Sequence, residues 1–164
     1  MANEKITSQK ISPFLWFDTN AEEAAKFYTS VFKNSSIDVV THYGDTGPMP
    51  KGMAMTVGFT LEGTVFTALN AGPVFKFNEA ISFVVHCDNQ EEVDYYWNKL
   101  TEGGNEVECG WLKDKFGLSW QIVPKRFFEL INTNDAAQRD RVMAAMMQMK
   151  KFNIKGLEEA AAKG

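Results

Sequence analysis

Two stretches of the chain share one pattern of apolar and polar positions. Each has a short apolar run, then Asn-x-Glu-Glu, then apolar residues at helical spacing. The first run covers residues 11–17 and leads to Asn20, and the second covers residues 81–86 and leads to Asn89, 89 − 20 = 69 positions later. Runs rich in Phe, Ile, Val and Trp are typical of strands. The repeat therefore predicts the same strand and helix twice.

The two asparagines mark the expected helix starts. An Asn side chain can accept a hydrogen bond from an otherwise unpaired N–H of the first helical turn. A Glu three positions later can reach back to the start of the helix, and acidic charge there suits the helix dipole. Glu91 and Glu92 are therefore interpreted as helix-start residues like Glu22 and Glu23, not as a catalytic carboxylate pair.

The rest of each copy favours strands. After the first helix the pattern predicts strands at residues 37–43, 53–61 and 64–69, and after the second at 105–112 and 118–123. Beyond Pro124 the pattern changes to helical, with segments at 127–131, 135–149 and 155–162. A chain with these elements belongs to the α+β class.

Composition narrows the function classes. The chain has 164 residues, 13 Phe, 4 Trp, 4 Tyr and a net charge of −4, without a block of basic residues. Nucleic acid is therefore not expected as a partner, because phosphate neutralisation needs clustered Lys and Arg. No membrane-length apolar run and no secretory signal are visible, so we expect a cytoplasmic protein with Cys87 and Cys109 reduced.

Several motifs in order resemble one protein family. PFLWFDTNAEEAAKFYTSVF, LNAGPVFKFNEAISFVVHCDNQEEV, GWLKDKFGLSWQIVPK and MAAMMQMKKFNI resemble the PhnB-like subfamily of the vicinal oxygen chelate (glyoxalase and bleomycin resistance) superfamily. The resemblance implies two tandem βαβββ modules that form curved half-barrel sheets around a cleft, with C-terminal helices, and a homodimer. It implies a single domain over residues 1–164, with module one at 11–71, module two at 79–123 and a helical extension at 125–162.

Members of this subfamily often carry the label 3-demethylubiquinone-9 3-methyltransferase. The sequence does not fit S-adenosylmethionine chemistry, since its glycines are scattered and Gly103-Gly104 ends a helix. It also lacks the alternation of strands and helices that a doubly wound sheet requires. We therefore expect no methyl transfer from this donor.

The resemblance also bears on metal binding. Metal-dependent members of the superfamily place His, Glu or Gln ligands on inward strand faces, and their last-strand pattern Asp-Pro-Asp-Gly-Asn-x-x-Glu aligns with residues 114–121 here. Gln121 then takes the place of the Glu ligand, and His86 is the only other plausible ligand. One Gln and one His are too few for a metal site. No metal and no cofactor are expected.

The remaining chemistry points to a ligand cleft. Aromatic rings with a few polar groups suit a planar or apolar organic ligand, and the candidate ligand-binding residues are Phe14, Trp16, Asn70, His86, Trp111, Trp120 and Gln121. The tryptophans can equally be core residues. His42 is interpreted as a cross-strand or surface residue and both cysteines as small buried hydrophobes, while the methionines of 135–149 are expected to pack the helix or a dimer contact.

Three functions follow from this reading. The first is a protein that binds a small organic ligand in an aromatic-lined cleft without a catalytic metal. The second is an enzyme of the same superfamily, of glyoxalase, dioxygenase, thiol-transferase or methyltransferase type. The third is a structural or regulatory dimer without a ligand. The sequence leaves the catalytic residues and the substrate open.

Overall fold

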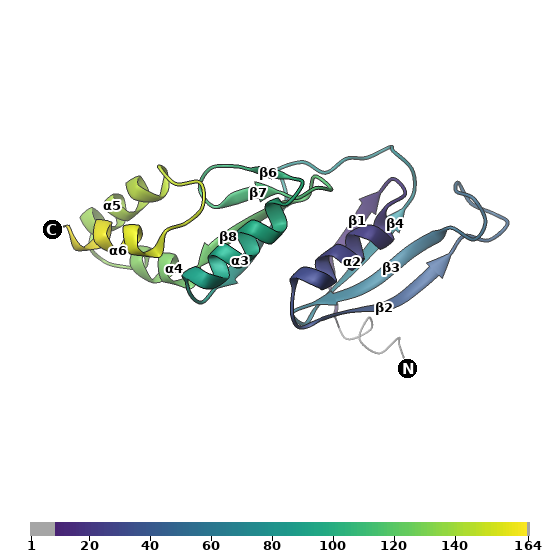
Figure 1. Ribbon diagram of the computed structural model, residues 1–164, viewed down its shortest axis with the longest axis horizontal. Coiled ribbons are helices and arrows are strands. Elements are labelled where there is room, and N and C mark those ends of the chain that lie inside the picture. Colours follow the sequence, from purple (N-terminus) through teal and green to yellow (C-terminus); the bar gives the residue numbers. More distant parts are fainter. Residues whose placement is uncertain (1–8, 164) are drawn as a thin grey trace. The chain divides into compact units, whose positions relative to one another are not determined.

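The computed structural model describes residues 9–163, so most of the polar segment at the start of the chain lies outside the described residues. The chain divides into two compact units: the first ends at Phe77 and the second begins at Asn78 (Figure 1). Among the described residues, no helix combines the length and the apolarity needed to cross a membrane.

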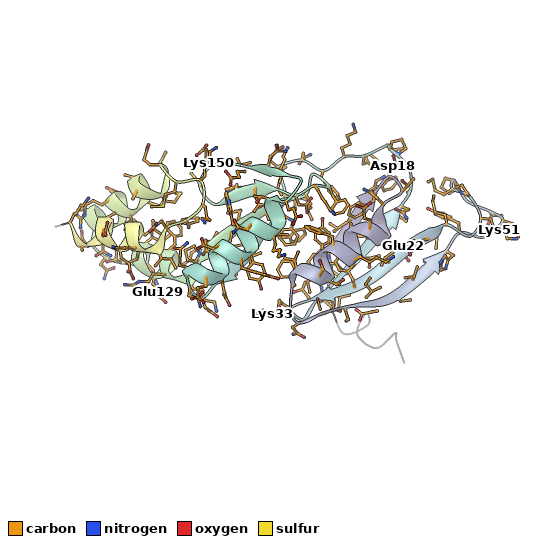
Figure 2. The ribbon with its side chains drawn as sticks, viewed as in Figure 1. Asp18, Glu22, Lys33, Lys51, Glu129 and Lys150 are labelled. Atoms are coloured by element: carbon orange, nitrogen blue, oxygen red, sulfur yellow. The ribbon has the colours of Figure 1, made fainter. Side chains whose placement is uncertain are left out.

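The first unit is a four-stranded sheet with one helix across it. Its elements are β1 (Phe14–Phe17), α2 (Ala21–Val31), β2 (Ser35–His42), β3 (Ala54–Leu61) and β4 (Thr64–Asn70). The strands lie in the order β1-β4-β3-β2, with β1 parallel to β4 and the other pairs antiparallel. The loop between β2 and β3 carries Lys51, which pairs with Asp45 at 2.7 Å (Figure 2).

The second unit repeats this topology. Its elements are β5 (Ser82–Cys87), α3 (Gln90–Thr101), β6 (Asn105–Glu106), β7 (Trp111–Lys113) and β8 (Ser119–Pro124), with the strands in the order β5-β8-β7-β6. The strand β5 is parallel to β8, as β1 is to β4. The predicted pair of βαβββ modules is therefore confirmed. Both sheets are open and uncurled, which differs from the curved half-barrel shape that the resemblance implies.

One expected strand is broken. Residues 105–112 were expected to be continuous, but β6 ends at Glu106 and β7 begins at Trp111. Cys109 (φ 60°) and Gly110 (φ 81°) both adopt left-handed backbone conformations between them. Such conformations end the extended geometry that a strand needs, so the strand divides at this turn.

The helix faces of the two sheets form the two cores. In the first unit Ala21, Ala24, Ala25 and Tyr28 of α2 are fully buried, and Tyr28 stacks on Phe59 of β3. In the second unit Val93, Trp97 and Leu100 of α3 cover their sheet. Because strand side chains alternate between the two faces of a sheet, every second residue lies on the face opposite α2 or α3. We call these two surfaces the first and second open faces.

Both helices begin directly after the predicted asparagines, but only the Asn89 side chain caps its helix. Asn89 Oδ1 accepts a hydrogen bond from Glu92 N at 2.9 Å, while Glu92 Oε2 accepts one from Asp88 N at 2.7 Å. The side chain of Asn20 makes no capping hydrogen bond. The predicted helix start at Asn20 is therefore confirmed, but its predicted side-chain cap is wrong, because Asn70 Oδ1 accepts the hydrogen bond from Ala21 N instead.

Three helices follow the second sheet and gather at one end of the second unit (Figure 1). They are α4 (Lys125–Ile131), α5 (Ala136–Met146) and α6 (Ile154–Ala162). The helix α5 packs against α4 and α6, and its Val142 is fully buried. Met147, which follows the helix, is 63% exposed.

The segment before α6 docks on the second sheet and on α3. Cys109 N and Gly110 N donate to the carbonyl oxygens of Met149 and Lys150 at 2.8 and 2.7 Å. Gln90 at the start of α3 binds the same segment through both ends of its amide, accepting from Ile154 N at 2.9 Å and donating to Phe152 O at 3.0 Å. The C-terminal helices are therefore attached by directed hydrogen bonds as well as by apolar packing.

Candidate functional site

The second open face is assembled from three strands. The register pairs Ser82 with Ser119 and Val84 with Gln121 between β5 and β8, and Trp111 with Gln121 between β7 and β8. Residues paired in register point to the same side of a sheet. Trp111, Gln121, Val84, Ser82 and Ser119 consequently share this face.

Gln121 is held in place by a hydrogen bond. Its Nε2 donates to Ser82 Oγ at 2.9 Å. A Gln that donates through nitrogen keeps an acceptor oxygen, and a Ser hydroxyl that accepts one bond can still donate another. The pair can therefore offer one acceptor and one donor to a molecule lying on the face. Trp111, half-buried beside it, supplies an apolar surface.

His86 lies at the far end of the same face. It is exposed, and its ring lies 5.6 Å from that of Phe128 in α4, which is itself 42% exposed. His86 follows Ser82 by four positions along β5, so it points to the same side. The predicted residue is thus available at this surface, beside an aromatic ring that the sequence pattern did not single out.

The first open face carries the two predicted aromatic residues of β1. Phe14 is 61% exposed. Trp16 points the same way, donates from Nε1 to Gly72 O at 2.9 Å and meets the ring of Phe75 edge to face at 4.9 Å. The hydrogen bond and the ring contact fix the orientation of the indole.

Asn70 and Trp120 lie on the helix-covered faces instead. Asn70 is 1% exposed; its Oδ1 accepts from Ala21 N at 2.8 Å and its Nδ2 donates to Ala54 O at 3.0 Å. Trp120 is buried and donates from Nε1 to Asp114 Oδ2 at 2.9 Å. The other five predicted ligand-binding residues lie on the open faces, so Asn70 and Trp120 are not carried into the candidate site.

Ser82 and Ser119 were missed by sequence reasoning. Their one signal is alternation: Ser119 precedes Gln121 by two positions and therefore shares its face. Their proximity depends on the parallel pairing of β5 with β8, which no local pattern reveals.

An ion pair lies next to this polar group. Lys113, in register with Ser119 across β7 and β8, pairs with Glu79, and this interaction lowers the pKa of the Glu79 carboxyl group.

The potential metal ligands do not gather. Among residues 9–163, no group of three or more His, Cys, Asp or Glu side chains is placed to hold a metal ion. Burial raises the pKa of the Cys87 thiol to about 12, with the carboxylates of Glu92 and Asp88 adding to the effect. A thiol with this pKa is protonated at neutral pH, so Cys87 is a poor nucleophile and a poor metal ligand.

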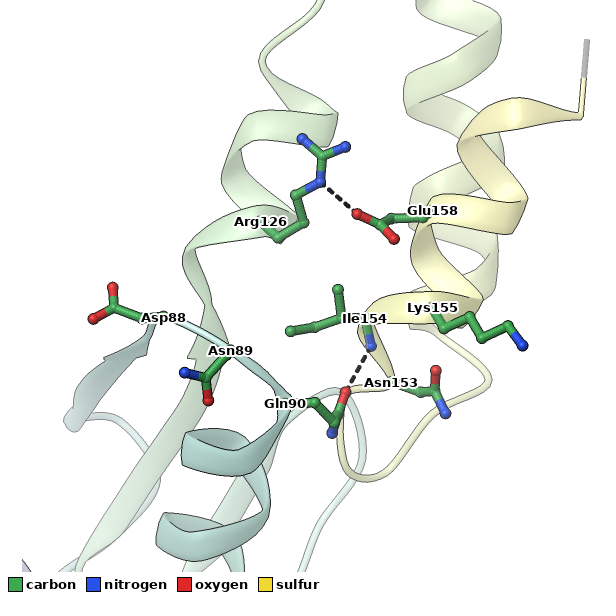
Figure 3. Close-up of a pocket in the computed structure, with 8 residues that line it drawn as sticks. All are labelled: Asp88, Asn89, Gln90, Arg126, Asn153, Ile154, Lys155 and Glu158. Atoms are coloured by element: carbon green, nitrogen blue, oxygen red, sulfur yellow. Dashed lines mark hydrogen bonds and ion pairs between the residues drawn. The ribbon is translucent and has the colours of Figure 1, made fainter.

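A pocket of about 510 Å³ lies where α3, α4 and α6 meet (Figure 3). Its lining includes Arg126 and Glu158, which pair at 2.8 Å, and the Gln90 amide that binds Ile154 N. Arg126 also donates to Glu129 at 3.0 Å. Because these polar groups bond to one another, we interpret the pocket as the joint that attaches the C-terminal helices.

Known proteins support the fold and the family. The sequence model described as 3-demethylubiquinone-9 3-methyltransferase matches residues 9–123. A PhnB protein from Bacillus cereus, whose name includes the same methyltransferase label, is 37% identical with a TM-score of 0.65; the match covers 71% of this chain and 99% of that one. No curated protein matches the chain.

More distant structures share the fold alone. Protein PA1353 from Pseudomonas aeruginosa is 21% identical with a TM-score of 0.58, over 71% of this chain and 97% of that one. The fosfomycin resistance protein FosX from Listeria monocytogenes is 15% identical with a TM-score of 0.54, over 74% of this chain and 95% of that one.

The family match ends at residue 123, before helix α4 begins at Lys125. The chain belongs to the PhnB-like 3-demethylubiquinone-9 3-methyltransferase family of the vicinal oxygen chelate superfamily.

Proposed function

We propose that this chain binds a small organic ligand with a planar, oxygen-bearing ring on its second open face, without a catalytic metal. The observation that carries the proposal is the Gln121–Ser82 pair at 2.9 Å beside Trp111. Small-molecule sites combine apolar and aromatic surface with a few placed polar groups. Trp111 and Val84 supply the apolar and aromatic surface, and the Gln121–Ser82 pair supplies the polar groups.

The family label supports the choice of ligand class. It names a demethylated ubiquinone, whose head group is a planar ring with several oxygen substituents. Such a ring can stack on an indole through its face and form hydrogen bonds through its edge. A Ser hydroxyl and a Gln amide suit carbonyl, hydroxyl and methoxy oxygens, because together they donate and accept.

Direct binding fits the residues better than metal-assisted binding. The position that aligns with the superfamily's Glu ligand holds Gln121, whose amide is uncharged and is already bonded to Ser82. Divalent metal sites generally need three or more protein ligands, and the described residues bring no such group together.

The residues also do not fit the methyl donor that the label implies. A nucleotide-type cradle needs glycines in the turn between a strand and the next helix. Here Asp18, Thr19 and Asn20 join β1 to α2, and Asp88 and Asn89 join β5 to α3. We therefore propose binding without S-adenosylmethionine. Micromolar affinity for this compound in a calorimetric titration would contradict that part of the proposal.

The experiment is an NMR titration with dimethoxyphenol. This probe is soluble, inert to thiols, and carries hydroxyl and methoxy oxygens on a planar ring. We expect a Kd below about 1 mM, within the range for a ligand of this size. The Trp111 Nε1–H and Gln121 side-chain amide signals should shift first. Trp111→Ala should weaken binding about tenfold, whereas Tyr95→Ala, which removes a half-buried ring from α3, should not.

The rival functions predict other outcomes. Turnover of a bound ring or of a 2-oxoaldehyde would favour the enzyme. Unchanged spectra with every ring compound would favour a ligand-free structural role. The homodimer is proposed on the family resemblance. Sedimentation at low micromolar concentration should give twice the mass of one chain, and a monomer would contradict it.

A further inference from the structure

One buried hydroxyl group on the second open face has no partner. Ser119 is 1% exposed, and within residues 9–163 its Oγ is the one buried side-chain oxygen or nitrogen without a hydrogen bond. Buried polar groups in folded proteins are nearly always hydrogen-bonded, and an unmade bond is unfavourable. Such an exception calls for a physical explanation.

A neighbouring buried polar group shows the usual situation. The Asp114 carboxylate is 3% exposed and accepts hydrogen bonds from Phe116 N, Leu118 N and Trp120 Nε1, at 2.9, 3.1 and 2.9 Å. These bonds shape the turn between β7 and β8. Ser119, at the start of β8, has no comparable structural task, so its polarity needs another explanation.

The register places the Ser119 hydroxyl within the proposed site. Ser119 lies opposite Ser82 across β5 and β8 and two positions before Gln121 on the same face. The strand β8 lies inside the sheet, between β5 and β7. Ser82, Gln121 and Ser119 therefore form a small polar group on the open face, with two members bonded to each other and the third unpartnered.

We propose that the Ser119 hydroxyl donates a hydrogen bond to a ring oxygen of the ligand, and that it selects oxygen-bearing rings over plain hydrocarbon rings. The inference rests on the proposed function. A site built with a buried polar group discriminates strongly against ligands that leave the group unpaired. The expected ligand is thus a quinone, quinol or alkoxyphenol type of ring.

Because Ser119 is 1% exposed, a ligand reaches its hydroxyl group only when a neighbouring side chain moves, and that of Lys113 is the candidate. Lys113 is in register with Ser119 on β7, and its Nζ pairs with Glu79. Its side chain is 31% exposed and that of Glu79 is 60% exposed. Exposed ion pairs contribute little to stability, so displacing the Lys113 side chain when a ligand enters is a small perturbation.

The test compares Ser119→Ala with the wild type in two measurements. In the NMR titration with dimethoxyphenol, the variant should bind about tenfold more weakly, the loss expected for one buried hydrogen bond. Without ligand, its urea unfolding midpoint should be unchanged or higher, because an unpaired polar atom has been removed. Ser119→Thr, which keeps a hydroxyl group, should bind more tightly than Ser119→Ala.

A matched control is Ser35→Ala. The Ser35 hydroxyl donates to Thr29 O at 2.8 Å and also contacts Phe32 O. Its removal should lower the unfolding midpoint and leave dimethoxyphenol binding unchanged. Equal affinity of wild type and Ser119→Ala for dimethoxyphenol overturns the role of Ser119 but not the proposed function. A lower urea unfolding midpoint for Ser119→Ala does the same. A wild type that binds no ring compound overturns the proposed function and this inference together.

Discussion

Asn70 Oδ1 accepts a hydrogen bond from Ala21 N at 2.8 Å, so the last residue of β4 caps the first turn of α2. Asn20, which stands at the capping position in the sequence, makes no side-chain cap. The same Asn70 donates to Ala54 O on β3 at 3.0 Å. One buried amide thus joins a helix and two strands of the first unit.

Asn70→Ala should therefore destabilise the chain by about 3 kcal/mol, because it leaves a buried N–H and a buried carbonyl oxygen unpaired. Asn20→Ala is the matched control and should change the free energy of unfolding by less than about 0.5 kcal/mol. Urea unfolding of the two variants measures both values. Equal losses would show that Asn70 does not replace Asn20 as the cap.

Gly110 should tolerate no side chain. A Cβ at this position would lie 2.3 Å from Phe152 Cε2 and 2.6 Å from its Cδ2, and the backbone is left-handed with φ +81°. At Gly117 φ is +86°, but no atom lies within 4 Å of such a Cβ. Gly117→Ala should cost about 1 kcal/mol, the usual strain.

Gly110→Ala should cost about 3 kcal/mol, because the clash adds to the strain. It should also loosen Phe152, which packs against Phe127 with ring centroids 5.1 Å apart. Thermal unfolding of the two Gly variants gives the comparison. A loss at Gly110 no larger than at Gly117 would mean that residues 149–152 do not dock as described.

Gln90→Ala should release the C-terminal helix. The Gln90 amide binds Phe152 O and Ile154 N, so its loss removes two bonds that hold the start of α6. Hydrogen exchange of residues 152–162 should become about tenfold faster, while α2 stays protected. Gln148→Ala, at an exposed position, is the control. Unaltered exchange in Gln90→Ala would refute the proposed joint.

Stability should decline in alkaline solution because of Cys87. Its pKa is raised from 9.0 to about 12 in the folded chain, so the unfolded chain releases this proton first. The contribution of the protonated Cys87 thiol to the free energy of unfolding is fully present below pH 9. It is lost progressively as the pH rises toward 12. Between pH 8 and pH 10 the wild type should lose about 1.4 kcal/mol more than Cys87→Ala. Urea unfolding at several pH values measures the free energy of unfolding of both proteins. The same pH dependence for wild type and Cys87→Ala would contradict the raised pKa of Cys87.

The strand and helix order of both units was predictable, because the same local pattern of apolar and polar residues occurs twice in the sequence. The runs before Asn20 and Asn89 and the helical spacing after them predict both units, since strand and helix periods differ. The break at Cys109 was less visible, because a left-handed backbone at a non-glycine residue is uncommon. The Asn70 cap was also hidden, because it depends on a contact 49 positions away along the chain.

The candidate site was predictable only in part. Alternation places Phe14 with Trp16, and Ser119 with Gln121, on shared strand faces. It does not say which face a helix covers, and for that reason Trp120 was counted with the ligand-binding residues although it lies under α3 in the core. The contribution of Ser82 depends on the pairing of β5 with β8, which is a property of the folded sheet.

The most direct test of metal-free ring binding on the second open face is the dimethoxyphenol titration of protein dialysed against EDTA, repeated after one equivalent of Zn²⁺ or Mn²⁺ is added. The account predicts the same Kd, below about 1 mM, in all three samples, with shifts at Trp111 and Gln121. Binding that appears only with the metal, or shifts confined to residues outside the second open face, would contradict it.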